Sequence, residues 1–395
     1  MSRTRRRTAA LALASALALA TLVTLSPAAA AAPGGHHALP SWQLKPVATT
    51  NQFRGLDAVS RDVAWVGGTE GGIFRTVDGG DTWADVSPPG TTGLQFRDVE
   101  AFGRNRAVVL AAGSLEESRI YRTDDGGQTW TQTFTNTDPD PLLFYDCMAF
   151  SDPRHGLALS DPSAEGKFRI IATRDGGRSW QLRSNAGMPD AITGEFAFAA
   201  SGTCLTTAGK GDFWFGTGGG AQARVFHSRD FGRTWTVVAT PVLSAPAGGI
   251  FSLAFRDHRH GFAIGGDFTA TGEAVDALAV TRDGGATWRL VPAEDAPAFY
   301  RSGSAFVQRP AGHHSHRWLR KHHWLGKHEQ GSVATRIALA VGPKGSDISF
   351  DGGNSWTALD PESGGFDAVE CAGDGSCWAS GPAGKVARLA FPHHR

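Results

Sequence analysis

The chain has 395 residues, and its 51 glycines exceed the usual share of about 7%. Hydrophobic residues make up 41% of the chain, charged residues 19%, and the formal net charge at pH 7 is zero. A chain this apolar, with 12 tryptophans, is not intrinsically disordered. The length suggests two or three domains unless the sequence repeats.

Residues 1–32 are predicted to form a secretory signal peptide. Four arginines within residues 3–7 precede an apolar run over residues 8–25, and small residues at 28–32 offer cleavage sites. A single membrane anchor is the alternative, but the alanine-rich run is short for a span of about 20 residues. We therefore expect a secreted or periplasmic protein without stable membrane insertion.

Export would also change the charge balance. Without the four arginines, 34 basic residues face 38 acidic ones. This balance argues against a nucleic-acid partner, because such partners are bound mainly through excess positive charge.

One octapeptide pattern, Ser/Thr-x-Asp-x-Gly-x-Ser/Thr-Trp, occurs six times. The copies span residues 76–83, 123–130, 173–180, 228–235, 281–288 and 349–356. Their aspartates are Asp78, Asp125, Asp175, Asp230, Asp283 and Asp351, and their tryptophans are Trp83, Trp130, Trp180, Trp235, Trp288 and Trp356. The intervals between aspartates run from 47 to 68 residues, so the chain is built from repeated units.

Each octapeptide is predicted to be a structural turn. Aspartate can accept backbone N–H groups ahead of it, glycine supplies positive φ, and the tryptophan can bury a large surface at the start of the next strand. The alternative is a catalytic or metal-binding role for the aspartates. Six equivalent sites spread around a ring cannot converge on one substrate, which favours the structural role.

Two β-rich segments precede most octapeptides, which indicates four strands per unit. The first segments include residues 56–59, 99–102, 147–150, 253–255 and 304–307, and the second include 63–66, 107–111, 156–159, 261–264 and 337–341. Short strands at a period of about 50 residues with turns between them are typical of the radial sheets of a β-propeller.

The two ends of the repeat region are predicted to share a seventh blade. Residues 366–371, 376–380 and 385–391 read as three strands without a fourth, whereas residues 41–47 resemble a strand that follows an octapeptide, with Trp42 in the tryptophan position. We therefore predict an all-β, seven-bladed propeller over residues 41–392. Its blades are four-stranded and antiparallel, and the N-terminal strand closes the last one.

The octapeptide resembles the Asp-box, or BNR repeat, of sialidases and other propeller families. Seven blades with such repeats in an exported chain most resemble the photosystem II assembly factor family and the related exported bacterial proteins. This resemblance implies a non-enzymatic scaffold that binds another protein on one face of the propeller. Apart from the resemblance, we expect a monomer without a cofactor.

Five residues are candidates for a binding site where the innermost strands enter the channel. They are Arg54, Arg97, Tyr145, Glu195 and Arg301. Basic and aromatic side chains at such a mouth would suit a carboxylate or an acidic segment of a protein. The alternative is a set of solvated or mutually paired channel residues.

Two enzyme classes remain as alternatives. Tyr145, Glu195 and three arginines could imitate a sialidase-type glycosidase site, but Phe53-Arg54 is followed by Gly-Leu where that family has Arg-Ile-Pro. A redox enzyme would need a cofactor site that is not evident. The glycines at 216–220 do not open a helix, so they do not indicate a dinucleotide.

The cysteines suggest disulfide bonds because the chain is expected to be exported. Cys371 and Cys377 flank a predicted hairpin turn and are expected to pair, whereas Cys147 and Cys204, on adjacent blades, either pair or stay buried. A basic insert at residues 311–330 in blade six is predicted to be a solvated loop. A metal site there is the alternative, through His313, His314, His316, His322 and His323.

Overall fold

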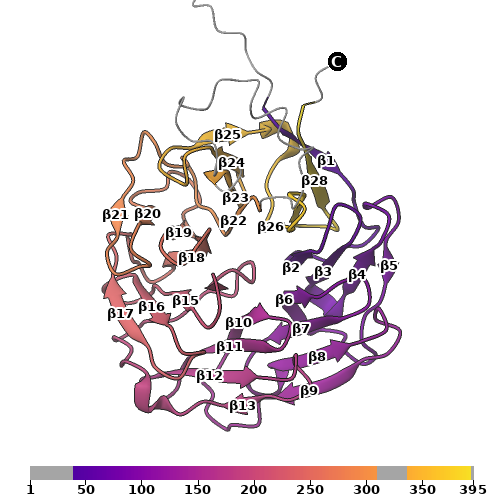
Figure 1. Ribbon diagram of the computed structural model, residues 1–395, viewed down its shortest axis with the longest axis horizontal. Helices are drawn as coiled ribbons and strands as arrows, with labels where there is room; N and C mark the ends of the chain where they lie inside the picture. Colours follow the sequence, from indigo (N-terminus) through magenta and orange to yellow (C-terminus); the bar gives the residue numbers. More distant parts are fainter. Residues whose placement is uncertain (1–38, 309–335, 393–395) are drawn as a thin grey trace, which may run out of the picture. The chain divides into compact units, whose positions relative to one another are not determined.

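The computed structural model describes residues 39–308 and 336–392. The predicted signal peptide and the histidine-rich insert, with its metal candidates, lie outside these residues. In the described part, seven four-stranded antiparallel sheets form a ring (Figure 1). The helices of this part are four single 3-10 turns, and none of its helices is long and apolar enough to cross a bilayer. The prediction of an all-β, seven-bladed propeller is confirmed.

In blades one to six the strands follow the chain from the innermost to the outermost position. Blade one holds β2 (Phe53–Ala58), β3 (Ala64–Gly68), β4 (Ile73–Thr76) and β5 (Ala84–Asp85), and blade two holds β6 (Gln95–Ala101), β7 (Ala107–Ala112), β8 (Arg119–Thr123) and β9 (Thr131–Thr135). Blade three holds β10 (Tyr145–Asp152), β11 (His155–Pro162), β12 (Phe168–Thr173) and β13 (Gln181–Leu182), and blade four holds β14 (Leu205–Thr207), β15 (Phe213–Gly216), β16 (Arg224–Ser228) and β17 (Thr236–Ala239). Blade five holds β18 (Gly248–Phe255), β19 (Gly261–Asp267), β20 (Leu278–Thr281) and β21 (Arg289–Leu290), and blade six holds β22 (Gly303–Phe306), β23 (Ala338–Gly342), β24 (Gly345–Ser349) and β25 (Thr357–Leu359).

Blade seven is made from both ends of the propeller, which confirms the predicted closure. It holds β26 (Ala368–Cys371), β27 (Cys377–Ser380) and β28 (Val386–Ala390), with β1 (Ser41–Leu44) as its outermost strand. Trp42 of β1 pairs with Leu389, its ring lies 5.2 Å from that of Phe366, and its Nε1 donates to Ser346 Oγ at 2.9 Å. The closing strand is therefore bound by main-chain pairing and by a buried indole.

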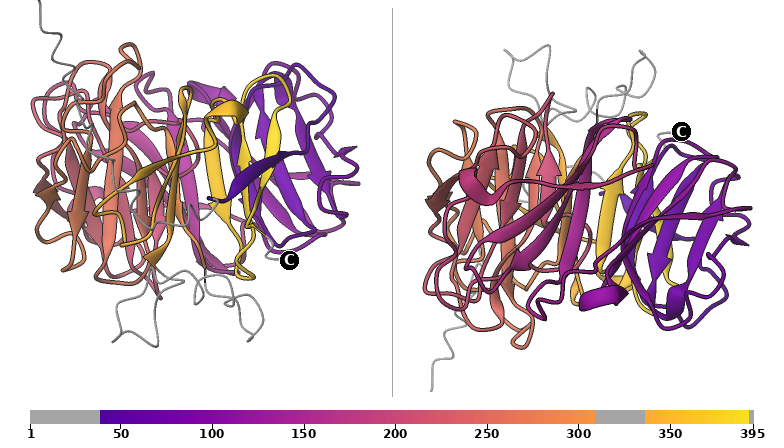
Figure 2. Two further views of the ribbon diagram at one scale, coloured as in Figure 1. Left: turned by 90° about the horizontal axis from the view of Figure 1, so that it is seen from above. Right: turned by 90° about the horizontal axis from the view of Figure 1, so that it is seen from below.

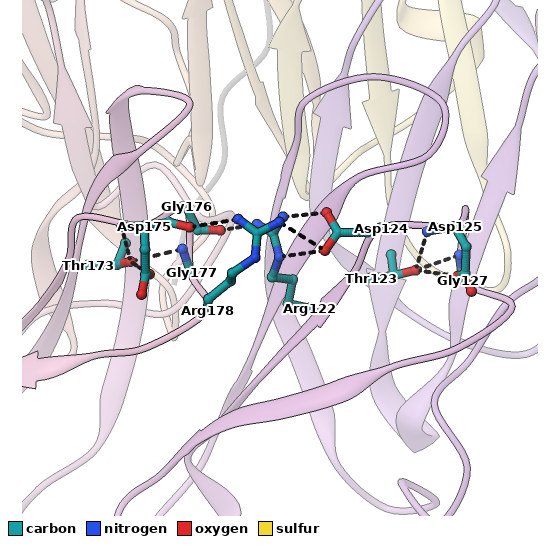
Figure 3. A network of polar contacts seen from close by, with 10 residues as sticks. All are labelled: Arg122, Thr123, Asp124, Asp125, Gly127, Thr173, Asp175, Gly176, Gly177 and Arg178. Carbon is teal, nitrogen blue, oxygen red and sulfur yellow. Dashed lines mark hydrogen bonds and ion pairs between the residues drawn. The ribbon is translucent and has the colours of Figure 1, made fainter.

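The octapeptides form the turns between the third and fourth strands of blades one to six, as Figure 3 shows for two of them. In the turn at 281–288, Asp283 accepts hydrogen bonds from Thr281 Oγ1 (2.9 Å), Thr287 N (2.9 Å) and Thr287 Oγ1 (2.6 Å). Gly284 and Gly285 have φ of 78° and 86°, a region that side chains disfavour. Both carboxylate oxygens are thus engaged by the turn itself, which suits the structural role.

Two disulfide bonds join the described cysteines. Cys371 and Cys377 pair across the β26–β27 hairpin, with their Cα atoms 4.1 Å apart. Cys147, for which the sequence left both pairing and burial open, bonds to Cys204, with a Cα–Cα distance of 6.2 Å. This second bond ties β10 of blade three to the residue that precedes β14 of blade four.

Candidate functional site

Different parts of each repeat form the two faces of the ring. Because the strands of a blade alternate in direction, each innermost strand begins on one face, the entrance face. The octapeptides, which follow the third strands, lie on the other, the turn face. Figure 2 shows the blades edge-on, with their strands running between the two faces. Candidate mouth residues must therefore come from the beginnings of the innermost strands.

Four innermost strands carry a bulge directly after their first pairing residue or close to it. The register shifts lie between Phe53 and Gly55, Phe96 and Asp98, Tyr145 and Cys147, and Ile250 and Ser252. A bulge takes one residue out of the ladder, and here these residues are Arg54, Arg97, Asp146 and Phe251. The structurally equivalent mouth residue of blade three is therefore Asp146, and the predicted alignment at Tyr145 was one residue out.

Tyr145 takes the place of Phe53 and Phe96 in its blade. Its side chain is 2% exposed and packs in the core between blades two and three, with its ring 5.1 Å from that of Phe134. Burial raises the pKa of its hydroxyl far above the usual value. Tyr145 therefore packs in the core between blades two and three and does not line the mouth.

Glu195 forms a buried ion pair inside blade four. Its Oε1 accepts from Arg224 Nε at 2.8 Å and from Thr217 Oγ1 at 2.6 Å, and its Oε2 contacts Arg224 Nη2 and accepts from Ile192 N. The residue is 5% exposed, and β14 starts only at Leu205. The structure therefore separates Glu195 from the other mouth candidates.

Arg301 likewise forms an ion pair within its own blade. Its Nε donates to Asp347 Oδ2 of β24 at 2.6 Å, its Nη1 donates to the carbonyl of Tyr300, and the residue is 2% exposed. A guanidinium that is buried and paired in this way is not free to bind a ligand.

Arg54 and Arg97 do lie together at the mouth. Burial, together with the positive charge of Arg54, lowers the pKa of Arg97 to about 10, against the attraction of Asp146. Arg97 Nη1 also donates to the carbonyl of Ala199 at 3.1 Å. Arg54 is half-buried and makes no side-chain hydrogen bond or ion pair with any residue that the structure describes. The charge of Arg54 acts on Asp367, whose pKa is raised by burial against the opposing effects of its hydrogen bond from Gln52 and of Arg54.

Aromatic side chains border the two arginines on the side of blades five and six. The rings of Phe198 and Phe251 stack at 3.8 Å, and Phe251 also contacts Tyr300 (4.8 Å) and Phe268 (6.1 Å). Phe268 is 52% exposed. The positive charge of Arg54 acts on Tyr300, where it opposes the rise in pKa that burial causes. We call Phe198, Phe251, Phe268 and Tyr300 the aromatic rim. Comparing the residues that follow the first apolar position of each innermost strand would have identified Asp146, Phe251 and Asp367.

The interior of the ring is crossed by residues 197–204, which we call the plug segment. Its Ala199 carbonyl binds Arg97 of blade two, Ser201 Oγ donates to the carbonyl of Ser302 at 2.7 Å, and its Thr203 carbonyl accepts from Leu253 N of blade five at 3.0 Å. Contacts with blades two, five and six place the segment across the centre. The segment therefore lies across the interior below the mouth.

Carboxylates line the other side of the interior, on the innermost strands of blades one, two and seven. We call Asp57, Asp98, Glu100 and Glu370 the channel carboxylates. Asp57 accepts from Ala101 N at 2.5 Å and Asp98 from Met148 N at 2.6 Å, so each of these two satisfies an N–H of the next blade. Burial raises the pKa of Asp57 to about 7 and that of Glu370 to about 8, and mutual repulsion adds to the effect at Glu370.

Within residues 39–308 and 336–392, no three His, Cys, Asp or Glu side chains are arranged to hold a metal ion. The residues that could imitate a sialidase site are also dispersed. Tyr145 lies in a blade core, Glu195 binds Arg224, and Arg301 binds Asp347.

The ring of seven four-stranded blades, closed by β1, defines the class of the protein: it is a seven-bladed β-propeller. Its fold is similar to that of YCF48 from Cyanidioschyzon merolae, with a TM-score of 0.56 at 17% identity over 88% of this chain and 98% of that one. The propeller domain of Doa1 aligns with a TM-score of 0.54 at 10% identity over 89% and 98% of the chains. The Pan2 WD40 domain of Neurospora crassa aligns with 0.53 at 12% over 87% and 90%. No protein-family model matches the chain, and no curated protein is recognisably similar.

Proposed function

We propose that the protein is a non-enzymatic scaffold that acts outside the cytoplasm and binds an acidic segment of another protein on its entrance face. The observation that carries this proposal is Arg54, a half-buried guanidinium without a partner among the described residues. It lies beside a second cation, Arg97, and near the aromatic rim, of which Phe268 is exposed. The resemblance of the repeats to those of an assembly-factor family supports a scaffold role.

The chemistry of the mouth suits a carboxylate with an apolar neighbour. A guanidinium binds carboxylates through two parallel hydrogen bonds, and such charge-assisted bonds are strong where water is partly excluded. Phe268 offers exposed apolar surface, supported from below by the buried ring of Phe251, as aromatic residues do at the centres of protein interfaces. The plug segment crosses the interior of the ring, which supports surface binding of an extended segment over enclosure of a small substrate.

Arg54→Ala should lower the affinity for acidic peptides by about tenfold to a hundredfold, because one charge-assisted contact is lost. The probe is a peptide array in which each acidic peptide is paired with its Asn/Gln isostere, followed by anisotropy titration of the strongest acidic binder. Arg97→Ala should act in the same direction.

Arg282→Ala is the matched control, because Arg282 is exposed and belongs to an octapeptide on the turn face. It should leave the affinity unchanged. Equal binding of acidic peptides and their isosteres, or full affinity in Arg54→Ala, would overturn the proposal. Arg301 is unsuitable for this test because its removal would leave Asp347 buried without its partner.

A further inference from the structure

Octapeptides of neighbouring blades meet on the turn face, where their second and sixth residues approach each other. Between blades two and three these residues are Asp124 and Arg178, which form an ion pair at 3.5 Å (Figure 3). Between blades five and six they are Arg282 and Asn354, with Nη2 and Oδ1 3.5 Å apart. In both intervals the two side chains are complementary.

A second arginine also connects the octapeptides of blades two and three. Arg122, directly before the octapeptide of blade two, donates to the carbonyl of Gly176 in the next octapeptide and pairs with Asp124 (Figure 3). Arg388 makes the corresponding bond from blade seven to the carbonyl of Gly79 at 3.4 Å.

The interval between blades three and four breaks both patterns. The residue that corresponds to Arg122 is Ala172, and the second and sixth positions are Arg174 and Arg233, which carry the same charge. Arg183, which follows β13, supplies the bond to the next octapeptide instead, from Nη2 to the carbonyl of Phe231 at 3.4 Å. The space between the octapeptides of blades three and four therefore has no counterpart of Arg122. It holds three cations where blades two and three have an ion pair.

A cavity of about 210 Å³ lies in this interval. Arg174, Arg183 and Arg233 line it together with Phe213, Phe231 and Leu157, and no carboxylate is among its lining residues. Burial, with the charges of Arg174 and Arg233, lowers the pKa of Arg183. None of the three arginines forms an ion pair with a residue that the structure describes.

The carboxylate that acts on Arg183, Asp230, forms no ion pair with any of the three arginines and is held by its own octapeptide. Asp230 accepts from Ser228 Oγ, Thr234 Oγ1 and the backbone N–H groups of its own octapeptide. His155, which also lines the cavity, pairs with Asp152 through Nδ1. The three arginines of the cavity are thus offset only in part, by the charge of Asp230 acting on Arg183, and no carboxylate of the described chain pairs with them directly.

We propose that this cavity is a second binding site, which takes a phosphate or sulfate ester with a small apolar group. Guanidinium groups bind such oxyanions through fixed, parallel N–H donors. Phe213, Phe231 and Leu157 would contact the apolar part. This site lies on the turn face, so it is independent of the proposed mouth.

Isothermal titration with phenyl phosphate, inorganic phosphate and phenyl sulfate at constant ionic strength tests the proposal. The wild type should bind phenyl phosphate saturably and more tightly than inorganic phosphate. Arg174→Asp should weaken binding at least about tenfold, because it removes a cation and recreates the Asp124–Arg178 arrangement of the neighbouring interval. For the same reason this variant should fold normally.

Arg233→Ala is a second variant and should also lose affinity, whereas Arg282→Ala should bind as the wild type does. Phenyl sulfate distinguishes a sulfate ester from a phosphate ester as the better ligand, and tighter binding of either ester than of inorganic phosphate supports the site. The proposal is overturned if the wild type shows no saturable binding, if inorganic phosphate binds as tightly, or if Arg174→Asp and Arg233→Ala retain full affinity.

Discussion

Glu195→Ala should lower the free energy of unfolding by about 3 to 5 kcal/mol, because it leaves the guanidinium of Arg224 buried without its partner. The hydroxyl of Thr217 would lose its acceptor as well. Chemical denaturation followed by tryptophan fluorescence measures the change. A loss of this size would show that Glu195 stabilises blade four.

The double variant Glu195→Ala/Arg224→Ala should be less destabilised than the sum of the two single variants, since it removes both buried charges together. Glu165→Ala is the matched control. Glu165 is exposed in its pair with Arg169, so its removal should cost no more than about 1 kcal/mol. A Glu195→Ala protein as stable as this control would contradict the buried-pair account.

The channel carboxylates should make the protein less stable as the pH rises above neutrality. Their pKa values are raised in the folded state, so the folded protein holds protons that the unfolded chain has released. This stabilisation is complete below the unfolded pKa near 4 and is lost as the pH rises through about 7 for Asp57 and about 8 for Glu370. The slope is about −1.4 kcal/mol per pH unit for each carboxyl that keeps its proton.

Thermal unfolding between about pH 6.5 and about pH 8.5 isolates this effect. His227 has the opposite influence, because burial lowers its pKa, but that contribution is already complete above its ordinary value of 6.5. Asp57→Asn and Glu370→Gln should flatten the pH dependence and be more stable than the wild type at the alkaline end. In Asp57→Asn, the amide oxygen of the new side chain can still accept the N–H of Ala101. Glu294→Gln, on an exposed loop, controls for the loss of one negative charge.

An unchanged melting temperature across this range would contradict the raised pKa values. So would a slope that the two variants share with the wild type.

The blades could be predicted because local residue chemistry determines them. The six octapeptides mark the turn between third and fourth strands directly, and Trp42 in the tryptophan position predicted the strand that completes blade seven. The mouth could be predicted only in part. A bulge takes one residue out of the ladder, and in blade three this residue is Asp146 and not Tyr145. The sequence shows this only when Tyr145 is aligned with Phe53 and Phe96, the first apolar residues of their strands.

Ion pairs between residues far apart in the chain could not be predicted from the sequence either. The partner of Arg301 is 46 residues away on β24, and the partner of Glu195 is 29 residues away on β16. Blade four lacked a recognisable first strand because the plug segment precedes the short β14. The cavity between blades three and four does have a sequence signal. Arg174 and Arg233 occupy octapeptide positions that hold complementary residues between blades two and three and between blades five and six, and aligning the octapeptides of neighbouring blades would have revealed the like charges.

The pairing of β1 with β28 also constrains the order of folding. Ser41 pairs with Ala390, so the contact that closes the ring has nearly the largest sequence separation that the described chain allows. A chain that emerges from its N-terminus can form blades one to six in turn, but β1 stays unpaired until residues 386–390 have followed. During that time the free edge and Trp42 are available to chaperones and proteases, and protection of β1 against hydrogen exchange is expected to be the last to develop.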